Sequence, residues 1–239
     1  MRAYERFLQY AVIHTTSDDT SGLTPSSQCQ FDLARHLVEE MRRLGIPDAH
    51  VDGKCYVYGS IPASPGCEDL PALGFCAHLD TASFNGKNVR PRLVPDYDGG
   101  DIVLGTSGRV LSPAQFPHLP QLRGKTLIVT DGATLLGADD KAGIAEILTM
   151  AETVLDRGLP HSRLCFSFPP DEEIGAGAKD LDLEKLGADV AYTVDGGELG
   201  MIQYESFNAA IARITITGIG VHPGHAKNIM RSALLVAHQ

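Results

Sequence analysis

The chain has 239 residues, 43% of them hydrophobic, so it can bury a substantial core in one large domain or in one domain and part of another. Its 30 Asp and Glu against 20 Lys and Arg argue against a nucleic-acid surface, which needs clustered positive charge. No apolar run approaches the ~20 residues that cross a bilayer, and residues 1–7 lack the apolar core of a signal peptide, which argues against a membrane protein.

Helices and strands alternate along most of the chain. Apolar residues at helical spacing predict a helix over residues 31–44, which Gly45 and Pro47 end. An alternating pattern over residues 50–59 predicts a short hairpin. A second amphipathic helix is predicted over residues 144–155, and further strands are predicted at residues 73–77, 127–129, 164–168 and 190–194. This alternation indicates an α/β fold with a mixed, largely parallel central sheet flanked by helices.

Two regions depart from the alternating pattern. Residues 85–137 are rich in Gly and Pro, which predicts loops and extra strands at the rim of the sheet. From Phe207 the pattern changes, and the alternation over residues 209–218 predicts the first strand of a second, α+β domain, followed by a helix from about Ala226. We therefore expect one domain over residues 1–206 and the incomplete beginning of another over residues 207–239.

Five short motifs with acidic or histidine residues follow one another along the chain. They occupy residues 77–80 (Ala-His-Leu-Asp), 137–141 (Gly-Ala-Asp-Asp-Lys), 170–173 (Pro-Asp-Glu-Glu), 194–197 (Val-Asp-Gly-Gly) and 221–224 (Val-His-Pro-Gly). Three of the motifs follow predicted strands, and the second leads into a predicted helix. Because ligands bind beyond the carboxyl ends of parallel strands, these four motifs could meet at one rim of the sheet.

The residue types in these motifs suit a metal centre. Zinc in hydrolases binds His nitrogen and carboxylate oxygen, and two metals can share one carboxylate. The chain offers His78, Asp139, Glu173 and Asp195 as ligands, with Glu172 as a free carboxylate that acts as the base. The spacing also allows Asp80, two residues after His78 on the same side of an extended chain, to accept a hydrogen bond from the imidazole.

Each motif taken alone has an ordinary structural explanation. An acidic pair is commonly the solvated start of a helix, and Asp139 or Asp140 could simply cap one. Asp195 between small residues could occupy a turn, and a lone histidine such as His222 is more often structural. The occurrence of all five motifs in this order, with several at strand ends, favours the metal centre.

The motifs resemble those of the M20 metallopeptidase family, and in particular its tripeptide aminopeptidases. The resemblance covers essentially the whole chain, and the block of residues 134–146 is far more selective than a lone His-x-Asp. The matching stretches are residues 74–81, 86–89, 99–102, 110–113, 134–146, 170–173, 192–197, 207–210 and 221–224. The resemblance implies a zinc-exopeptidase-like fold, with the catalytic domain in residues 1–206 and a lid and dimerisation domain beginning in residues 207–239.

The resemblance also implies roles for individual residues. Two zinc ions would be bridged by Asp139, one held by His78 and Asp195 and the other by Glu173, with Glu172 as the general base. Asp80 would be the carboxylate that supports His78, and the peptide bond between Asp139 and Asp140 would be cis. The lid histidine, His222, would help to hold the reacting carbonyl, across a dimer or after domain closure.

One ligand of the implied centre has no counterpart in the chain. Family members continue further and supply a last histidine to the metal that Glu173 and the bridging Asp hold, and neither His225 nor His238 lies in that motif. We therefore expect a truncated copy or fragment in which one metal position lacks a ligand and which could be inactive.

The expected activity is hydrolysis of the N-terminal peptide bond of tripeptides by a water activated by two zinc ions. Small peptides would be the substrates, and a homodimer could form through the lid. The five cysteines include no CxxC pair, which indicates reduced thiols in a cytoplasmic protein. One alternative is another M20 hydrolase, an N-acyl amino acid deacylase or a carboxypeptidase, although residues 86–88 and 101–113 favour the aminopeptidase. A second alternative is an inert metal-binding fragment.

Overall fold

The computed structural model describes residues 1–105, 107–197, 199–205, 208–210 and 212–238. The chain divides into two units, Met1–Glu198 and Leu199–Gln239, and each is described by itself. The first unit holds a five-stranded sheet and its helices, together with two small sheets. Among the described residues, no helix is long and apolar enough to cross a membrane. The domain boundary at residues 206 and 207 stays a prediction.

The central sheet is mixed, as the sequence predicts, and its parallel half positions the site. The strand order is β1 (His50–Val51), β2 (Val57–Ile61), β8 (Leu164–Phe168), β3 (Leu73–Cys76) and β9 (Val190–Thr193). Strand β2 is antiparallel to β1 and β8, whereas β3 is parallel to both β8 and β9, with Phe75 opposite Phe166 on one side and Tyr192 on the other. The carboxyl ends of β3, β8 and β9 therefore lie at one edge.

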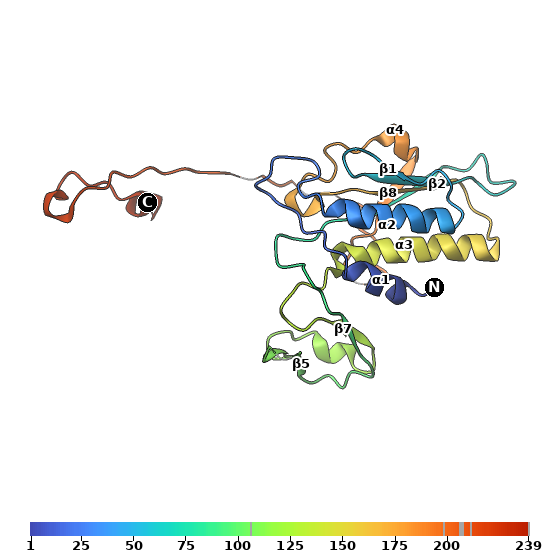
Figure 1. The fold of residues 1–239 in the computed structure, drawn as a ribbon, viewed down its shortest axis with the longest axis horizontal. Coiled ribbons are helices and arrows are strands. Elements are labelled where there is room, and N and C mark those ends of the chain that lie inside the picture. Colours follow the sequence, from blue (N-terminus) through green and yellow to red (C-terminus); the bar gives the residue numbers. More distant parts are fainter. Residues whose placement is uncertain (106, 198, 206–207, 211, 239) are drawn as a thin grey trace. The chain divides into compact units, whose positions relative to one another are not determined.

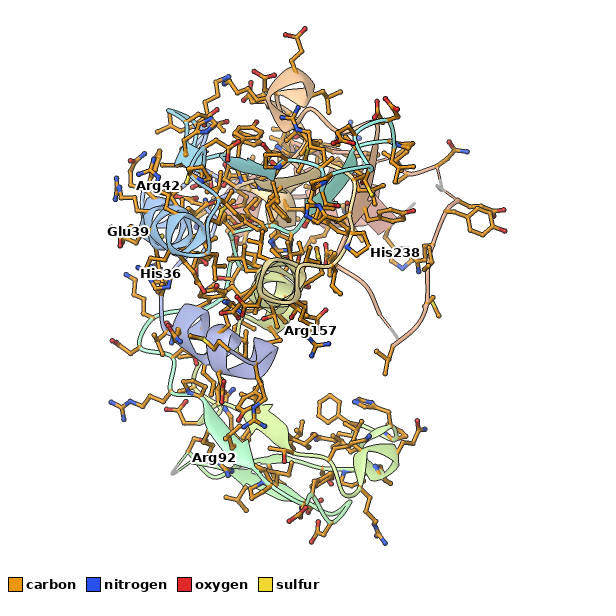
Figure 2. All side chains as sticks on the ribbon, turned by 90° about the vertical axis from the view of Figure 1, so that its right-hand side faces the viewer. His36, Glu39, Arg42, Arg92, Arg157 and His238 are labelled. Atoms are coloured by element: carbon orange, nitrogen blue, oxygen red, sulfur yellow. The ribbon has the colours of Figure 1, made fainter. Side chains whose placement is uncertain are left out.

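Helices α2 (Gln30–Arg43) and α3 (Ala138–Arg157) lie on one face of this sheet, and α1 (Ala3–Ala11) packs against α3 (Figure 1). Their apolar side chains meet those of β2 and β8 in the main core, which includes Phe7, Leu37, Met41, Ile144, Leu148, Phe166 and Phe168. The outer face of α2 is polar, and His36, Glu39 and Arg42 project from it (Figure 2). The short helix α4 (Leu183–Leu186) lies on the opposite face, where Leu186 packs with Tyr56, Tyr58 and Cys165.

A buried ion pair joins the three helices of the main core. The Arg6 guanidinium of α1 donates to the Glu40 carboxylate of α2 at 2.6 Å, and the Tyr10 hydroxyl donates to the same carboxylate at 2.5 Å. Arg6 also donates to the Thr149 hydroxyl of α3 at 2.7 Å. Because each buried polar group finds a partner, this cluster fixes the packing of α1 against α2 and α3.

The region between β3 and α3 forms two small sheets with a core of their own. Strand β4 (Arg92–Val94) pairs with β7 (Leu127–Val129), and β5 (Ile102–Leu104) pairs with β6 (Arg109–Leu111), both antiparallel. The 3-10 helix η1 (Leu119–Leu122) contributes to a buried cluster of Tyr97, Ile102, Leu119 and Val129. The predicted extra strands are confirmed, and the strand at residues 127–129 belongs to one of these small sheets, outside the central one.

The second unit differs from the sequence prediction. Its elements are the 3-10 helix η3 (Pro223–His225), the helix α5 (Ala233–His238) and a bridge between Ile219 and Arg231. The predicted strand over residues 209–218 is wrong for the part that the structure describes, since nothing there pairs with it; Phe207 and Ile211 lie outside the described residues. The predicted helix from Ala226 begins only at Ala233, because Asn228 has a left-handed backbone (φ +65°), which interrupts a helix.

The contact of α3 with the end of β9 leads to a testable prediction. A Cβ atom at Gly143 would overlap the Val194 carbonyl oxygen and the Asp140 carboxylate. Gly143→Ala is therefore expected to lower the free energy of unfolding by roughly 1–3 kcal/mol, because α3 must move away from the sheet. Urea denaturation measures this change, and Gly53→Ala is the matched control, since a Cβ atom there meets no atom within 4 Å. Equal stability of both variants would contradict the close contact.

Candidate metal centre

The predicted site residues of the first unit meet at the edge where the three parallel strands end. His78 follows β3, Glu172 and Glu173 follow β8, and Asp195 follows β9. Asp139 lies in the first turn of α3, where its backbone is not helical (φ −83°, ψ 108°). The peptide bond between Asp139 and Asp140 is cis, as the resemblance implies. Four separate chain segments thus converge on one rim.

His78, Asp139 and Asp195 form the most compact group. The Nε2 atom of His78 lies 3.0 Å from Oδ1 of Asp139 and 3.9 Å from Oδ2 of Asp195. One nitrogen or oxygen atom from each residue lies within 4.8 Å of the others. Glu172 is adjacent, with its Oε2 atom 3.7 Å from the same Nε2. The His78 ring is buried whereas Asp139 is 70% exposed, so the group is open to solvent on one side.

Asp80 contacts the imidazole with its carboxylate, which the sequence analysis expected to support the ring, and with its backbone carbonyl, which it did not predict. The Nδ1–H of His78 donates to the backbone carbonyl of Asp80 at 2.9 Å, and Nε2, the other ring nitrogen, faces the carboxylates. The Asp80 carboxylate is 3.3 Å from Nδ1, but it accepts from the backbone N–H groups of Glu172 (2.9 Å) and Glu173 (3.2 Å). Asp80 therefore links the segment of His78 to the turn that carries both glutamates.

Two further predicted residues, Glu173 and His222, also lie outside the compact group. The Glu173 carboxylate accepts from the Ala82 N–H at 3.1 Å. Burial raises the pKa of Glu173, and the negative charge of Asp139 raises it further, so the carboxylates of Glu173 and Asp139 interact. His222 belongs to the second unit, where its ring nitrogen accepts from the Gly224 N–H at 3.1 Å. Its role at the site stays a prediction.

Asp140 is a site residue to which the sequence reasoning gave no role. Its buried carboxylate accepts from the backbone N–H of His78 at 3.1 Å. Burial raises the pKa of Asp140 to about 8, and the charges of Asp195 and Asp139 add to the rise. The available signal was the pair of adjacent Asp residues at a helix start, because capping accounts for only one of them.

The donor set fits a divalent metal. One imidazole nitrogen and two carboxylate oxygens are the ligands that zinc takes in hydrolases. The second ring nitrogen is held by a hydrogen bond, which is the usual support of a metal-binding histidine. Burial raises the pKa values of Glu172 and Asp195, and Asp139 raises both further, so the carboxylates repel one another in the absence of a cation. A bound cation would relieve that repulsion.

The acid–base state of His78 predicts how metal binding depends on pH. Burial lowers the pKa of the ring, but the hydrogen bond and charge of Asp80, with Asp140 and Asp139, outweigh it and raise the pKa to about 10. Near neutral pH the ring must lose a proton before Nε2 can bind a metal. The Zn²⁺ affinity of the chain is therefore expected to rise by about tenfold per pH unit between about pH 6 and 8. Titration calorimetry in buffers of different ionisation enthalpy measures the released proton, and a pH-independent affinity would show that His78 is not protonated in the metal-free chain.

A pocket of about 310 Å³ opens beside the compact group. His78, Glu172 and Asp195 form one wall, and the rest is mostly small or apolar: Cys76, Ala77, Pro169, Gly175, Gly177, Ala178, Leu181 and Thr193. The pocket places uncharged surface next to the carboxylates, which suits a small ligand with an apolar part and a polar, reacting part.

The chain is similar over its whole length to curated proteins named peptidase T. It is 48% identical over 241 residues to that of Clostridium perfringens strain SM101, which covers 100% of this chain and 59% of the relative. It is 50% identical over 236 residues to that of Geobacillus kaustophilus, covering 98% of this chain and 57% of the relative. The chain thus spans less than two thirds of the length of these relatives. No family model matches it.

Solved structures share its fold. A tripeptidase from Staphylococcus aureus superposes with a TM-score of 0.58 at 25% identity, over 82% of this chain and 43% of that one. An M20 family metallo-carboxypeptidase from Sulfolobus solfataricus superposes with a TM-score of 0.51 at 18% identity, over 83% of this chain and 38% of that one. The second likeness concerns the fold alone.

Proposed function

We propose that this chain, a homologue of peptidase T along its whole length, forms the metal centre of an aminopeptidase that removes the N-terminal residue of tripeptides. The observation that carries the proposal is the compact group of His78, Asp139 and Asp195, whose candidate ligand atoms lie within 4.8 Å of one another. The name tripeptidase of the related Staphylococcus aureus structure supports the substrate class. The pocket beside the group has room for a small peptide side chain.

We assign the metal ligands as follows. His78, Asp139 and Asp195 would hold one zinc ion, and Asp139 with Glu173 would take part in holding a second. When bound, the metal polarises the scissile carbonyl and lowers the pKa of water. The described residues contain the full compact group for one ion, whereas the second position has only Glu173 beside the shared Asp139. We therefore propose that the first position binds metal more tightly.

The protein's own residues would handle the proton and the substrate. Glu172 stands next to the ligands, and burial raises its pKa, which suits a base that takes a proton from water and passes it to the leaving amine. Asp80 would hold the His78 ring in a fixed position relative to the turn that carries Glu172 and Glu173 (the glutamate turn). His222, through the second unit or a dimer built on it, would help to hold the reacting carbonyl. A cytoplasmic location belongs to the same proposal.

Metal content and substrate preference test the proposal together. Elemental analysis of the purified chain is expected to give at least one zinc ion, and a panel of tripeptides is expected to be hydrolysed in preference to N-acyl amino acids or peptides that are cleaved from the carboxyl end. Preference for N-acyl amino acids or carboxyl-terminal cleavage would assign the site to another kind of M20 hydrolase. Zinc without any hydrolysis would support an inert metal-binding fragment, and no bound metal would reject the centre.

A further inference from the structure

Asp171 occupies an unusual position immediately before the two glutamates. It follows β8 and precedes the short 3-10 helix η2 (Glu172–Ile174), and its side chain is fully buried. Its backbone is left-handed (φ +60°), a conformation that costs energy for most residues but is tolerated by Asp and Asn. The backbone of Asp171 therefore helps to set the direction in which the chain enters the turn that carries both glutamates.

The Asp171 side chain is held by residues at the start of α2. Its Oδ2 accepts from the Ser26 N–H at 2.7 Å, and its Oδ1 accepts from the Ser26 hydroxyl at 2.5 Å and the Gln30 side chain at 2.7 Å. The side-chain oxygen of Gln30 (Oε1) in turn accepts from the backbone N–H of Asp171 at 3.2 Å. The Gln30 amide thus braces both the side chain and the backbone of Asp171. Among the described residues, no ion pair involves this carboxylate.

The other side of the same turn is held by the segment that carries His78. The Asp80 carboxylate accepts from the N–H groups of Glu172 and Glu173. The stretch before Ser26 also binds that segment, because Ser17 donates to the Thr81 carbonyl at 3.0 Å and the Thr81 N–H donates to Thr15 at 3.2 Å. The glutamate turn is therefore clamped between Asp171 on one side and Asp80 on the other.

We propose that Asp171, locked by Ser26 and Gln30, is a positioning residue that aims Glu172 and Glu173 at the metal centre. The role of Asp171 rests on the proposed function of those two glutamates. A glycine could adopt the left-handed backbone more cheaply, but it would leave the turn free to rotate. Burying a carboxylate without a cation costs free energy, and here three hydrogen bonds from Ser26 and Gln30 to the Asp171 carboxylate offset that cost. Residues that orient metal ligands in this way typically contribute about 10–100-fold to affinity or activity.

A pair of substitutions tests the lock. Asp171→Asn keeps the size and the left-handed backbone, but whichever way its amide is turned, its NH2 group meets another donor, either the Gln30 amide or the Ser26 N–H. Gln30→Glu instead sets a second carboxylate against Asp171. In the double variant Asp171→Asn with Gln30→Glu, the new side-chain amide faces the new carboxylate, which can also accept from the N–H at position 171. The Ser26 hydroxyl can accept as well as donate, so every group is again paired.

Two measurements on the 239-residue chain report the position of the turn without relying on activity. Amide hydrogen exchange of Glu172 and Glu173 is expected to accelerate at least about tenfold in either single variant and to return toward the wild-type rate in the double variant. The Zn²⁺ affinity, measured by competition with a chromophoric chelator, is expected to fall about 10–100-fold and to recover in the same way. Tyr10→Phe removes a buried hydrogen bond far from the turn, so it should lower the melting temperature and change neither measurement.

The outcomes separate this role from general stability and from the proposed function. Wild-type exchange and affinity in Asp171→Asn would overturn the proposal. A double variant no better than the single ones, or equal losses in Tyr10→Phe, would also overturn it, because the effect would then be one of overall stability. If the wild-type chain binds no Zn²⁺, the metal centre fails while the exchange rates still decide the role of Asp171.

Discussion

Replacement of Glu172 by glutamine is expected to slow tripeptide hydrolysis by about 10²–10⁴-fold, with the bound metal unchanged. The Glu172 carboxylate lies 3.7 Å from Nε2 of His78, within the same opening as the candidate ligands. Burial and the charges of Asp195, Asp80 and Asp139 raise its pKa against the opposing charge of His78, which brings it closer to neutral pH. A glutamine of the same shape cannot take up the proton. The turnover number with a saturating tripeptide is the quantity to measure.

The control for Glu172→Gln is Glu184→Gln. This variant removes the same charge from an exposed position in α4. This variant should keep full turnover, and both variants should carry the same zinc content by elemental analysis. If Glu172→Gln cleaves tripeptides at the wild-type rate, Glu172 is not the base. If it loses zinc, Glu172 is itself a ligand and the roles of the two adjacent glutamates must be exchanged.

Asp139→Asn is expected to weaken Zn²⁺ binding by more than about 100-fold. Residues that only support a ligand contribute about 10–100-fold, and Asp139 is the residue shared between both proposed metal positions. Its Oδ1 atom lies 3.0 Å from Nε2 of His78, so the loss of its charge removes the carboxylate nearest to the imidazole. Competition with a chromophoric chelator at fixed pH measures the change.

Asp101→Asn provides the matched control for this experiment. Asp101 is exposed and lies in the region of the small sheets, away from the three-residue group. The control should bind Zn²⁺ as the wild type does. Equal affinity in Asp139→Asn and the wild type would mean that the His78 cluster is an ordinary hydrogen-bonded group and not a metal centre.

The gathering of the acidic motifs could be read from the sequence because strand order imposes it. Apolar runs that end in His78, Glu172 or Asp195 place those residues at one edge once their strands are parallel, and the described sheet has this arrangement. The helix that begins near Asp139 is equally plain, because its apolar residues repeat at helical spacing over several turns. The strand ends and the helix start are local patterns, whereas the meeting of the residues at one edge also requires the parallel pairing of β3 with β8 and β9.

The supporting contacts could not be read in the same way. Asp171 binds residues 141 and 145 positions away, and Asp80 binds backbone amides 92 and 93 positions away, so no local pattern announces either pairing. The alternating pattern over residues 209–218 led instead to a predicted strand that the described residues do not form. Alternating apolar residues satisfy a strand only where a neighbour pairs with them, and the described part of the second unit supplies none.

The long-range hydrogen bonds that hold the turn of Glu172 and Glu173 bear on when a metal could bind during folding. The candidate ligands come from segments 61 residues apart for His78 and Asp139, and the turn is braced across 145 residues by Ser26 and Asp171. An unfolded chain would have to close these long loops before the ligands could gather, at a cost in chain entropy. If the proposed centre binds a metal, the ion would therefore bind late in folding, and an ion that binds only the folded chain would stabilise it by mass action.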